Sequence, residues 1–119
     1  MDARRYQVYN GVYTWSEGVF TELTPPRALS IEECVEDVKK YGKKVIFLGD
    51  GVPVHREYIE KELKESANFA PASCNAQRAS SLAALALTRQ DSKKSCYEIS
   101  PVYLRKPQAE REREERGIK

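Results

Sequence analysis

One histidine and three cysteines are the residues of this chain best suited to nucleophilic chemistry. His55 could act as a general base for a thiol nucleophile, with Cys34, Cys74 or Cys96 as that nucleophile. Cys34 lies on the apolar face of a predicted helix and is expected in the core. Cys74 precedes a predicted helix, where a capping-region role is favoured over catalysis. His55, one turn into another predicted helix, is expected at the surface. We therefore predict no catalytic residue.

Gly49-Asp50-Gly51 follows a predicted buried strand and precedes a predicted helix, which is where open α/β sheets bind ligands. Asp50 could there contact a metal ion or a ribose. The segment matches neither the phosphate-binding loop nor the glycine pattern of dinucleotide-binding folds. A second histidine or a regular carboxylate spacing, which a metal site would need, is not present in the sequence. We predict a tight turn, with no cofactor and no metal ligand.

Arg4 and Arg5 stand beside Tyr6 and Tyr9, a combination that could contact phosphate or RNA. We favour the alternative that these charges flank a strand that enters from a neighbouring domain. The segment 109–116 consists almost entirely of Glu and Arg and could dock on RNA or on an acidic partner. Its alternating signs favour instead a solvated helix with ion pairs between residues four positions apart.

Charge and length narrow the class of protein. The chain has 119 residues, the size of one domain, and a net charge of +2. Residues 105–119 carry six basic and four acidic side chains, so the preceding part is neutral. A neutral body argues against a broad nucleic-acid-binding face. The scattered cysteines suit a reducing compartment, and no apolar run is long enough for a membrane span. We predict a cytoplasmic protein.

The elements that position these residues begin with a strand at about 4–15, apolar or aromatic on both faces and therefore expected to be covered on both sides. Residues 19–23 form the second arm of a predicted β-hairpin. Pro25 and Pro26 are expected to end its ladder, because proline has no N–H to donate.

Helix signals follow the hairpin. Ser30 and Glu33 form a capping box, and Gly42 stands where a helix C-terminus favours a left-handed residue. The predicted order is β-β-α-β-α-(β)-α, an α/β domain with a mixed sheet and packed helices. We place a single domain at 1–105 and a charged tail or helix at 106–119. The further predicted elements are a strand at 44–48, a helix at 53–64, an extended segment at 69–71 and a helix at 76–90 capped by Asn75 and packed through a small-residue face.

Asp2-Ala3-Arg4-Arg5-Tyr6-Gln7-Val8-Tyr9 is similar to a D-A-R-R-x-x-V-Y segment near the middle of the TsaB (YeaZ) family. Residues 69–73, followed by the alanine-rich helix, resemble a step before the family's last large helix. Residues 101–105 resemble its P-x-Y-x-R close, and the Gly49-Asp50-Gly51 turn is also similar. The likeness spans essentially the whole chain.

The resemblance implies a ribonuclease-H-like lobe of the actin-like ATPase superfamily. Members of the family have two lobes and support, without catalysing it, the formation of threonylcarbamoyladenosine at position 37 of tRNA. The partners implied are the TsaD transferase and the TsaE ATPase, with tRNA contacted indirectly. An older description of such chains is glycoprotease-like. Only the C-terminal lobe is matched, so no site or partner-contact residue is carried over.

Three functions remain open. The first is a non-catalytic scaffold; the second is a glycoprotease-like hydrolase that uses Cys74 or His55; the third is an RNA-binding accessory domain that uses Arg4, Arg5 and the tail. Because the first lobe of the family is not in this sequence, we expect the first strand and its neighbouring helices to expose apolar surface. Self-association into a homo-oligomer is then expected.

Overall fold

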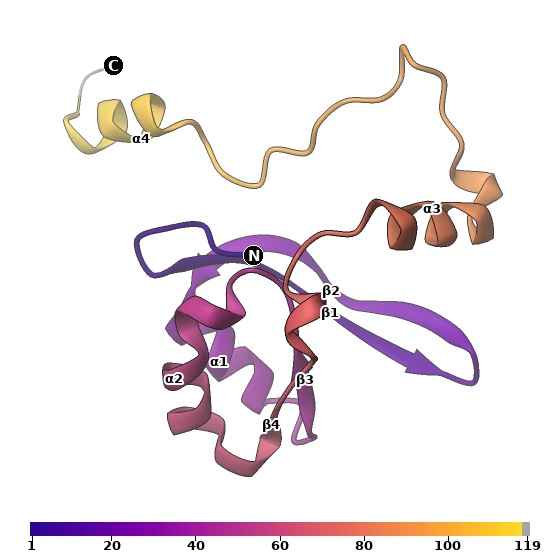
Figure 1. Ribbon diagram of the computed structural model, residues 1–119. Helices are drawn as coiled ribbons and strands as arrows, with labels where there is room; N and C mark the ends of the chain where they lie inside the picture. Colours follow the sequence, from indigo (N-terminus) through magenta and orange to yellow (C-terminus); the bar gives the residue numbers. More distant parts are fainter. Residues whose placement is uncertain (118–119) are drawn as a thin grey trace.

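The computed structural model describes residues 1–117 and has a mixed α/β architecture in the predicted order (Figure 1). Short 3₁₀ turns at Lys64–Ser66, Ala72–Cys74 and Gln90–Ser92 connect the larger elements. Those elements are β1 (Gln7–Ser16), β2 (Val19–Ser30), α1 (Ile31–Lys39), β3 (Val45–Phe47), α2 (Val52–Leu63), β4 (Ala67–Phe69), α3 (Ala79–Thr88) and α4 (Gln108–Glu115).

The strands form two small sheets within residues 1–117, where a single mixed sheet was predicted. β1 pairs with β2 antiparallel, and β3 pairs with β4 parallel. The second edge of β1 is occupied at its start by the N-terminal residues, because Asp2 forms an antiparallel bridge with Val8.

β2 continues through Pro25 and Pro26 to Ser30, so the prediction that the prolines end the ladder was wrong. The register shifts between Asn10 and Val12, and the two prolines lie opposite this irregularity. β2 has a free edge in this two-stranded sheet, and edges and bulges are where a sheet tolerates proline. The missing N–H groups therefore do not interrupt the pairing further along.

β1 begins at Gln7, three residues later than predicted. Arg4, Arg5 and Tyr6 have φ angles of 64°, 51° and 58°, the left-handed conformation, which cannot continue a strand. The expectation that both faces of β1 would be covered was also wrong. Val8 is buried, but Tyr13 and Trp15 are 42% and 68% exposed, because the far half of the hairpin extends beyond the body of the protein (Figure 1).

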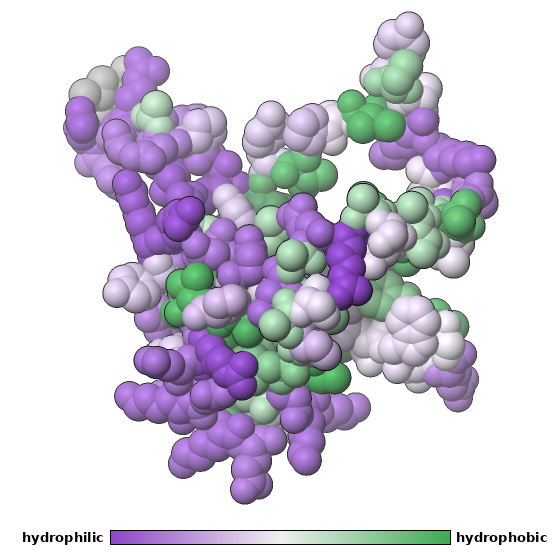
Figure 2. Space-filling view, viewed as in Figure 1, coloured by the Kyte–Doolittle hydropathy of each residue, from purple (hydrophilic) through white to green (hydrophobic). Residues whose placement is uncertain are grey.

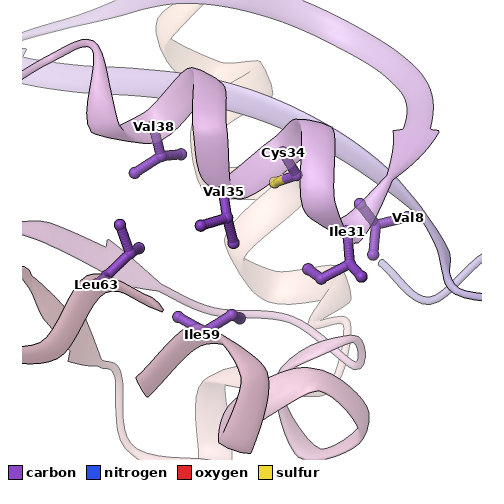
Figure 3. Close-up of a cluster of buried hydrophobic side chains, with 7 residues drawn as sticks. All are labelled: Val8, Ile31, Cys34, Val35, Val38, Ile59 and Leu63. Carbon is purple, nitrogen blue, oxygen red and sulfur yellow. The ribbon is translucent and has the colours of Figure 1, made fainter. Parts of the chain in front are cut away.

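The core lies between α1, α2 and the start of β1. The capping box is confirmed: Ser30 accepts a hydrogen bond from the Glu33 N–H, and Glu33 accepts one from the Ser30 N–H. The helix that follows places Val35 fully inside, against Ile59 and Leu63 of α2 (Figure 3). The buried side chains of this cluster are Val8, Ile31, Cys34, Val35, Val38, Ile59 and Leu63.

The chain after residue 75 forms an arm that leaves this core through α3 and then turns back, so that Arg105 reaches the N-terminal segment (Figure 1). α3 begins after Arg78, without the predicted Asn75 cap, and has no buried residue, so the predicted close packing of its small-residue face was wrong. The radius of gyration is 16.7 Å, whereas a compact chain of this length has about 13–14 Å. α4 is charged and solvated as predicted, and the last two positions of the 106–119 tail lie outside the described residues.

Candidate functional site

A tight turn joins the N-terminal segment to β1 and gathers several of the residues singled out above. The Ala3 N–H donates to Gln7 O at 2.9 Å, and the Gln7 N–H donates to Arg4 O at 3.0 Å. The Arg4 N–H donates to Asp2 Oδ1 at 3.0 Å. Left-handed backbone costs a non-glycine residue roughly 1–2 kcal/mol. Three such residues in a row persist only where the surrounding structure holds them.

The turn between β3 and α2 provides part of that support. Gly49 has a φ of 105°, and Asp50 Oδ1 accepts a hydrogen bond from the Asp2 N–H at 3.0 Å. A Cβ atom at Gly51 would lie only 3.2 Å from Asp2 N, so the N-terminal segment passes directly against this turn. The tight turn is thus formed as predicted, and the Asp50 carboxylate secures the N-terminal segment.

His55 is 6% exposed, so its predicted surface position was wrong. It lies four positions before Ile59 and three after Val52, both buried, and so belongs to the inward face of α2. The burial of His55 could therefore have been predicted from this spacing in the sequence. His55 Nε2 lies 3.7 Å from Asp2 Oδ1 and has no hydrogen-bond partner within residues 1–117.

Arg105 closes the turn from the far end of the chain. Its Nη1 donates to Ala3 O at 2.9 Å and to Gln7 Oε1 at 2.7 Å. No role was predicted for Arg105 from the sequence. The P-x-Y-x-R motif, in which Arg105 stands, was the signal in the sequence that could have indicated a role. In the structure Arg105 connects this motif to the D-A-R-R motif about a hundred positions away.

The cysteines are dispersed and do not pair with His55. Cys34 is in the core, as predicted, and burial raises the pKa of its thiol, which disfavours the nucleophilic thiolate. Cys74 is half-buried in a 3₁₀ turn and Cys96 is exposed. In the described part of the chain, His55 makes no hydrogen bond to a cysteine, and no group of three or more His, Cys, Asp or Glu side chains is arranged to hold a metal ion.

A surface depression of about 230 Å³ lies between the C-terminal ends of α1 and α2. It is smaller than typical small-molecule sites, which enclose about 300–1,000 Å³. Lys39 and Glu62, which both line it, form an ion pair at 3.3 Å. We therefore interpret the depression as a feature of the packing between α1 and α2.

Fold and site together define a small α/β domain whose polar cluster secures an N-terminal turn. No protein-family model and no solved structure matches the chain, so the ribonuclease-H-like assignment stays a prediction. The chain is 30% identical over 109 residues to the tRNA threonylcarbamoyladenosine biosynthesis protein TsaB of Bacillus subtilis. The match covers 92% of this chain. Over this stretch the chain is related to TsaB, as its motifs predicted.

The chain spans about half the length of this relative, with 47% of TsaB covered by the match. Within residues 1–117, none of the helices combines the length and apolar composition needed to cross a bilayer.

Proposed function

We propose that the chain acts in tRNA threonylcarbamoyladenosine biosynthesis as a non-catalytic, cytoplasmic scaffold that binds TsaD-like and TsaE-like proteins. The observation that carries the proposal is the relationship to TsaB over nearly the whole chain. On this view the domain is a ribonuclease-H-like lobe, and its work is to present surfaces to partner proteins.

Two exposed apolar surfaces support a role in protein binding. The hairpin tip is defined by Tyr13, Trp15, Val19 and Phe20. The rings of Tyr13 and Phe20 are stacked with their centroids 5.1 Å apart, and the Trp15 ring is tilted against Phe20 at 5.5 Å. Leu82 and Leu87 are exposed on α3, along which Figure 2 shows apolar side chains at the surface. Contiguous exposed apolar surface is typical of protein interaction sites.

The proposal is tested by adding the purified chain to a mixture of TsaD, TsaE, tRNA and the small-molecule substrates. Threonylcarbamoyladenosine is then measured by mass spectrometry of the digested tRNA. We expect more product than in the mixture without the chain, and co-purification of the chain with at least one partner. If the chain neither stimulates the reaction nor co-purifies with a partner, the scaffold role is ruled out.

Two variants separate the scaffold from the hydrolase alternative. If the chain is a scaffold, Cys74→Ala should leave the stimulation unchanged. If the chain instead acts as a hydrolase through this thiol, Cys74→Ala should abolish its effect. Trp15→Ser, at the hairpin tip, should weaken stimulation and co-purification together. The matched control is Tyr97→Ser, because Tyr97 is an exposed aromatic residue outside the hairpin tip.

A further inference from the structure

Arg4, Arg5 and Tyr6 form the left-handed turn, whose side chains face solvent. The Arg4 side chain is 89% exposed, Tyr6 is 77% exposed and Arg5 is also exposed. Within residues 1–117, Arg5 makes no side-chain hydrogen bond or ion pair, and the nearest anion to Arg4 is Asp2 Oδ2, 3.8 Å from Nε. Figure 1 shows this turn as the indigo loop that projects from the body before β1.

The backbone of the left-handed turn is fixed at both ends. The Ile31 N–H, at the first residue of α1, donates to Tyr6 O at 2.9 Å. Arg4 is held through both its N–H and its carbonyl, and Arg105 fastens the preceding residue, Ala3. The three exposed side chains are therefore presented by a rigid frame that includes the core helix. Such preorganisation lowers the entropic cost of binding.

The chemistry of these side chains suits RNA. Guanidinium groups bind phosphate oxygens through paired hydrogen bonds, and aromatic rings stack on bases that are not paired in a duplex. An acidic protein surface would satisfy the two arginines but would leave the exposed tyrosine ring unused. A body that is neutral outside its tail limits the contact to a few nucleotides, which fits a single-stranded loop better than a long duplex.

We propose that the left-handed turn binds RNA directly, with Arg4 and Arg5 on backbone phosphates and Tyr6 stacked on an unpaired base of a tRNA loop. This inference rests on the proposed function, which supplies tRNA as the RNA concerned. It adds a direct contact by this chain to a role otherwise exercised through protein partners.

The contact has a measurable salt dependence. Each phosphate contact to single-stranded nucleic acid contributes about −0.7 to the slope of log affinity against log salt concentration. Two arginine contacts therefore predict a slope of about −1.4. Stacking on one base is worth a factor of about ten in affinity and depends little on salt.

Binding is measured by fluorescence anisotropy with a labelled tRNA anticodon stem–loop and the full chain, from about 50 to about 200 mM salt. The double variant Arg4→Ala/Arg5→Ala should lose about tenfold or more in affinity at the lowest salt, and its slope should approach zero. Alanine meets the same left-handed penalty as arginine, so the backbone is not favoured or disfavoured by the change. The control, Lys43→Ala/Lys44→Ala, removes the same charge from another exposed site and should bind like the unchanged chain.

Tyr6→Ala should weaken binding to the stem–loop about tenfold while preserving the slope. A fully paired RNA of the same length should bind more weakly than the stem–loop. Circular dichroism melting establishes that each variant is folded.

Three results would overturn the proposal: equal affinity of the arginine double variant and the unchanged chain, equal loss in the lysine control, or tighter binding to a polyglutamate peptide than to RNA. Stimulation of tRNA modification without RNA binding would refute the direct contact and leave the scaffold role in place. Absence of stimulation, of co-purification with a partner and of RNA binding would refute the scaffold role as well.

Discussion

At the scale of single residues, the junction between β2 and α1 shows how a few polar atoms stabilise the fold. Ser30 caps α1, and the next residue, Ile31, donates its N–H to Tyr6 in the left-handed turn. Hydrogen bonds from the Ser30 backbone N–H and then its hydroxyl lower the pKa of Glu33. The cap thus links the core helix to the proposed RNA contact.

Ser30→Ala should lower the free energy of unfolding by about 1 kcal/mol, because a free N–H of α1 loses its acceptor. Chemical denaturation near neutral pH measures this change. The control is Ser80→Ala on the exposed α3, which should have little effect. An equal loss in both variants would contradict the role of the cap.

The same cap predicts a pH dependence. The folded-state pKa of Glu33 is depressed below its ordinary value, so its contribution is present above the unfolded-state pKa and is lost as pH falls through the folded-state pKa. Glu33→Gln, which retains an acceptor oxygen but cannot ionise, should therefore flatten the acid limb of the stability profile. The control is Glu32→Gln, one position away. The acid limb of the stability profile should be steeper for Glu32→Gln than for Glu33→Gln.

The three cysteines should differ in reactivity. Cys96 is exposed, Cys74 is half-buried, and Cys34 combines burial in the core with a raised thiol pKa. Because the thiolate is the reacting form, iodoacetamide should modify Cys96 first and Cys34 last, with Cys34 reacting readily only in denaturant. Peptide mass spectrometry over a time course follows each site. Modification of Cys34 at the rate of Cys96 in the folded chain would show that the core is open.

At the scale of elements, local patterns predicted more than long-range ones. The capping box of α1, Pro53 at the start of α2 and the left-handed Gly42 are short-range signals, and all three were confirmed. β2 continues through its prolines because one of its edges is free. Which edge of a strand is free depends on how the whole sheet is assembled, and a local sequence pattern does not show it. The burial of His55 follows from its helical spacing to Val52 and Ile59. Arg105, by contrast, acquires its place from a contact with the N-terminal segment, which spacing along the chain does not encode.

The turn between β3 and α2 should be sensitive to added volume at Gly51. Gly51 has a φ of −73°, so alanine is compatible with the backbone there, but its Cβ would lie 3.2 Å from Asp2 N and 3.3 Å from the Met1 carbonyl carbon. Gly51→Ala should displace the N-terminal segment and cost about 1 kcal/mol. Hydrogen exchange at the Ala3 and Tyr9 N–H groups should become faster, because both are bonded within that segment.

A second variant tests the same support by a different route. Asp50→Ala removes the acceptor of the Asp2 N–H without adding volume, and it should accelerate exchange at the same amides. Unchanged exchange in both variants would show that the turn between β3 and α2 does not hold the N-terminal segment.

At the scale of the whole molecule, a compact body contrasts with an arm whose first helix, α3, is apolar. α3 carries no charged residue between Ala79 and Thr88 and has no buried residue, although a helix that is apolar on all sides is normally buried. Its neighbour is the hairpin tip, where the Arg89 guanidinium lies 5.8 Å from the centre of the Phe20 ring. These two exposed surfaces together have the composition of a protein interface.

The purified chain should therefore self-associate, because joining the exposed surfaces of α3 removes apolar area from water at about 25 cal/mol per Å². Sedimentation velocity should show a weight-average coefficient that rises with protein concentration. The double variant Leu82→Ser/Leu87→Ser should reduce this rise, since both leucines are exposed and their replacement removes no core contact. Tyr97→Ser, which removes an exposed aromatic ring elsewhere, should retain it. A coefficient independent of concentration in the unchanged chain would mean that the arm remains solvated and that its apolar helix is compatible with a monomer.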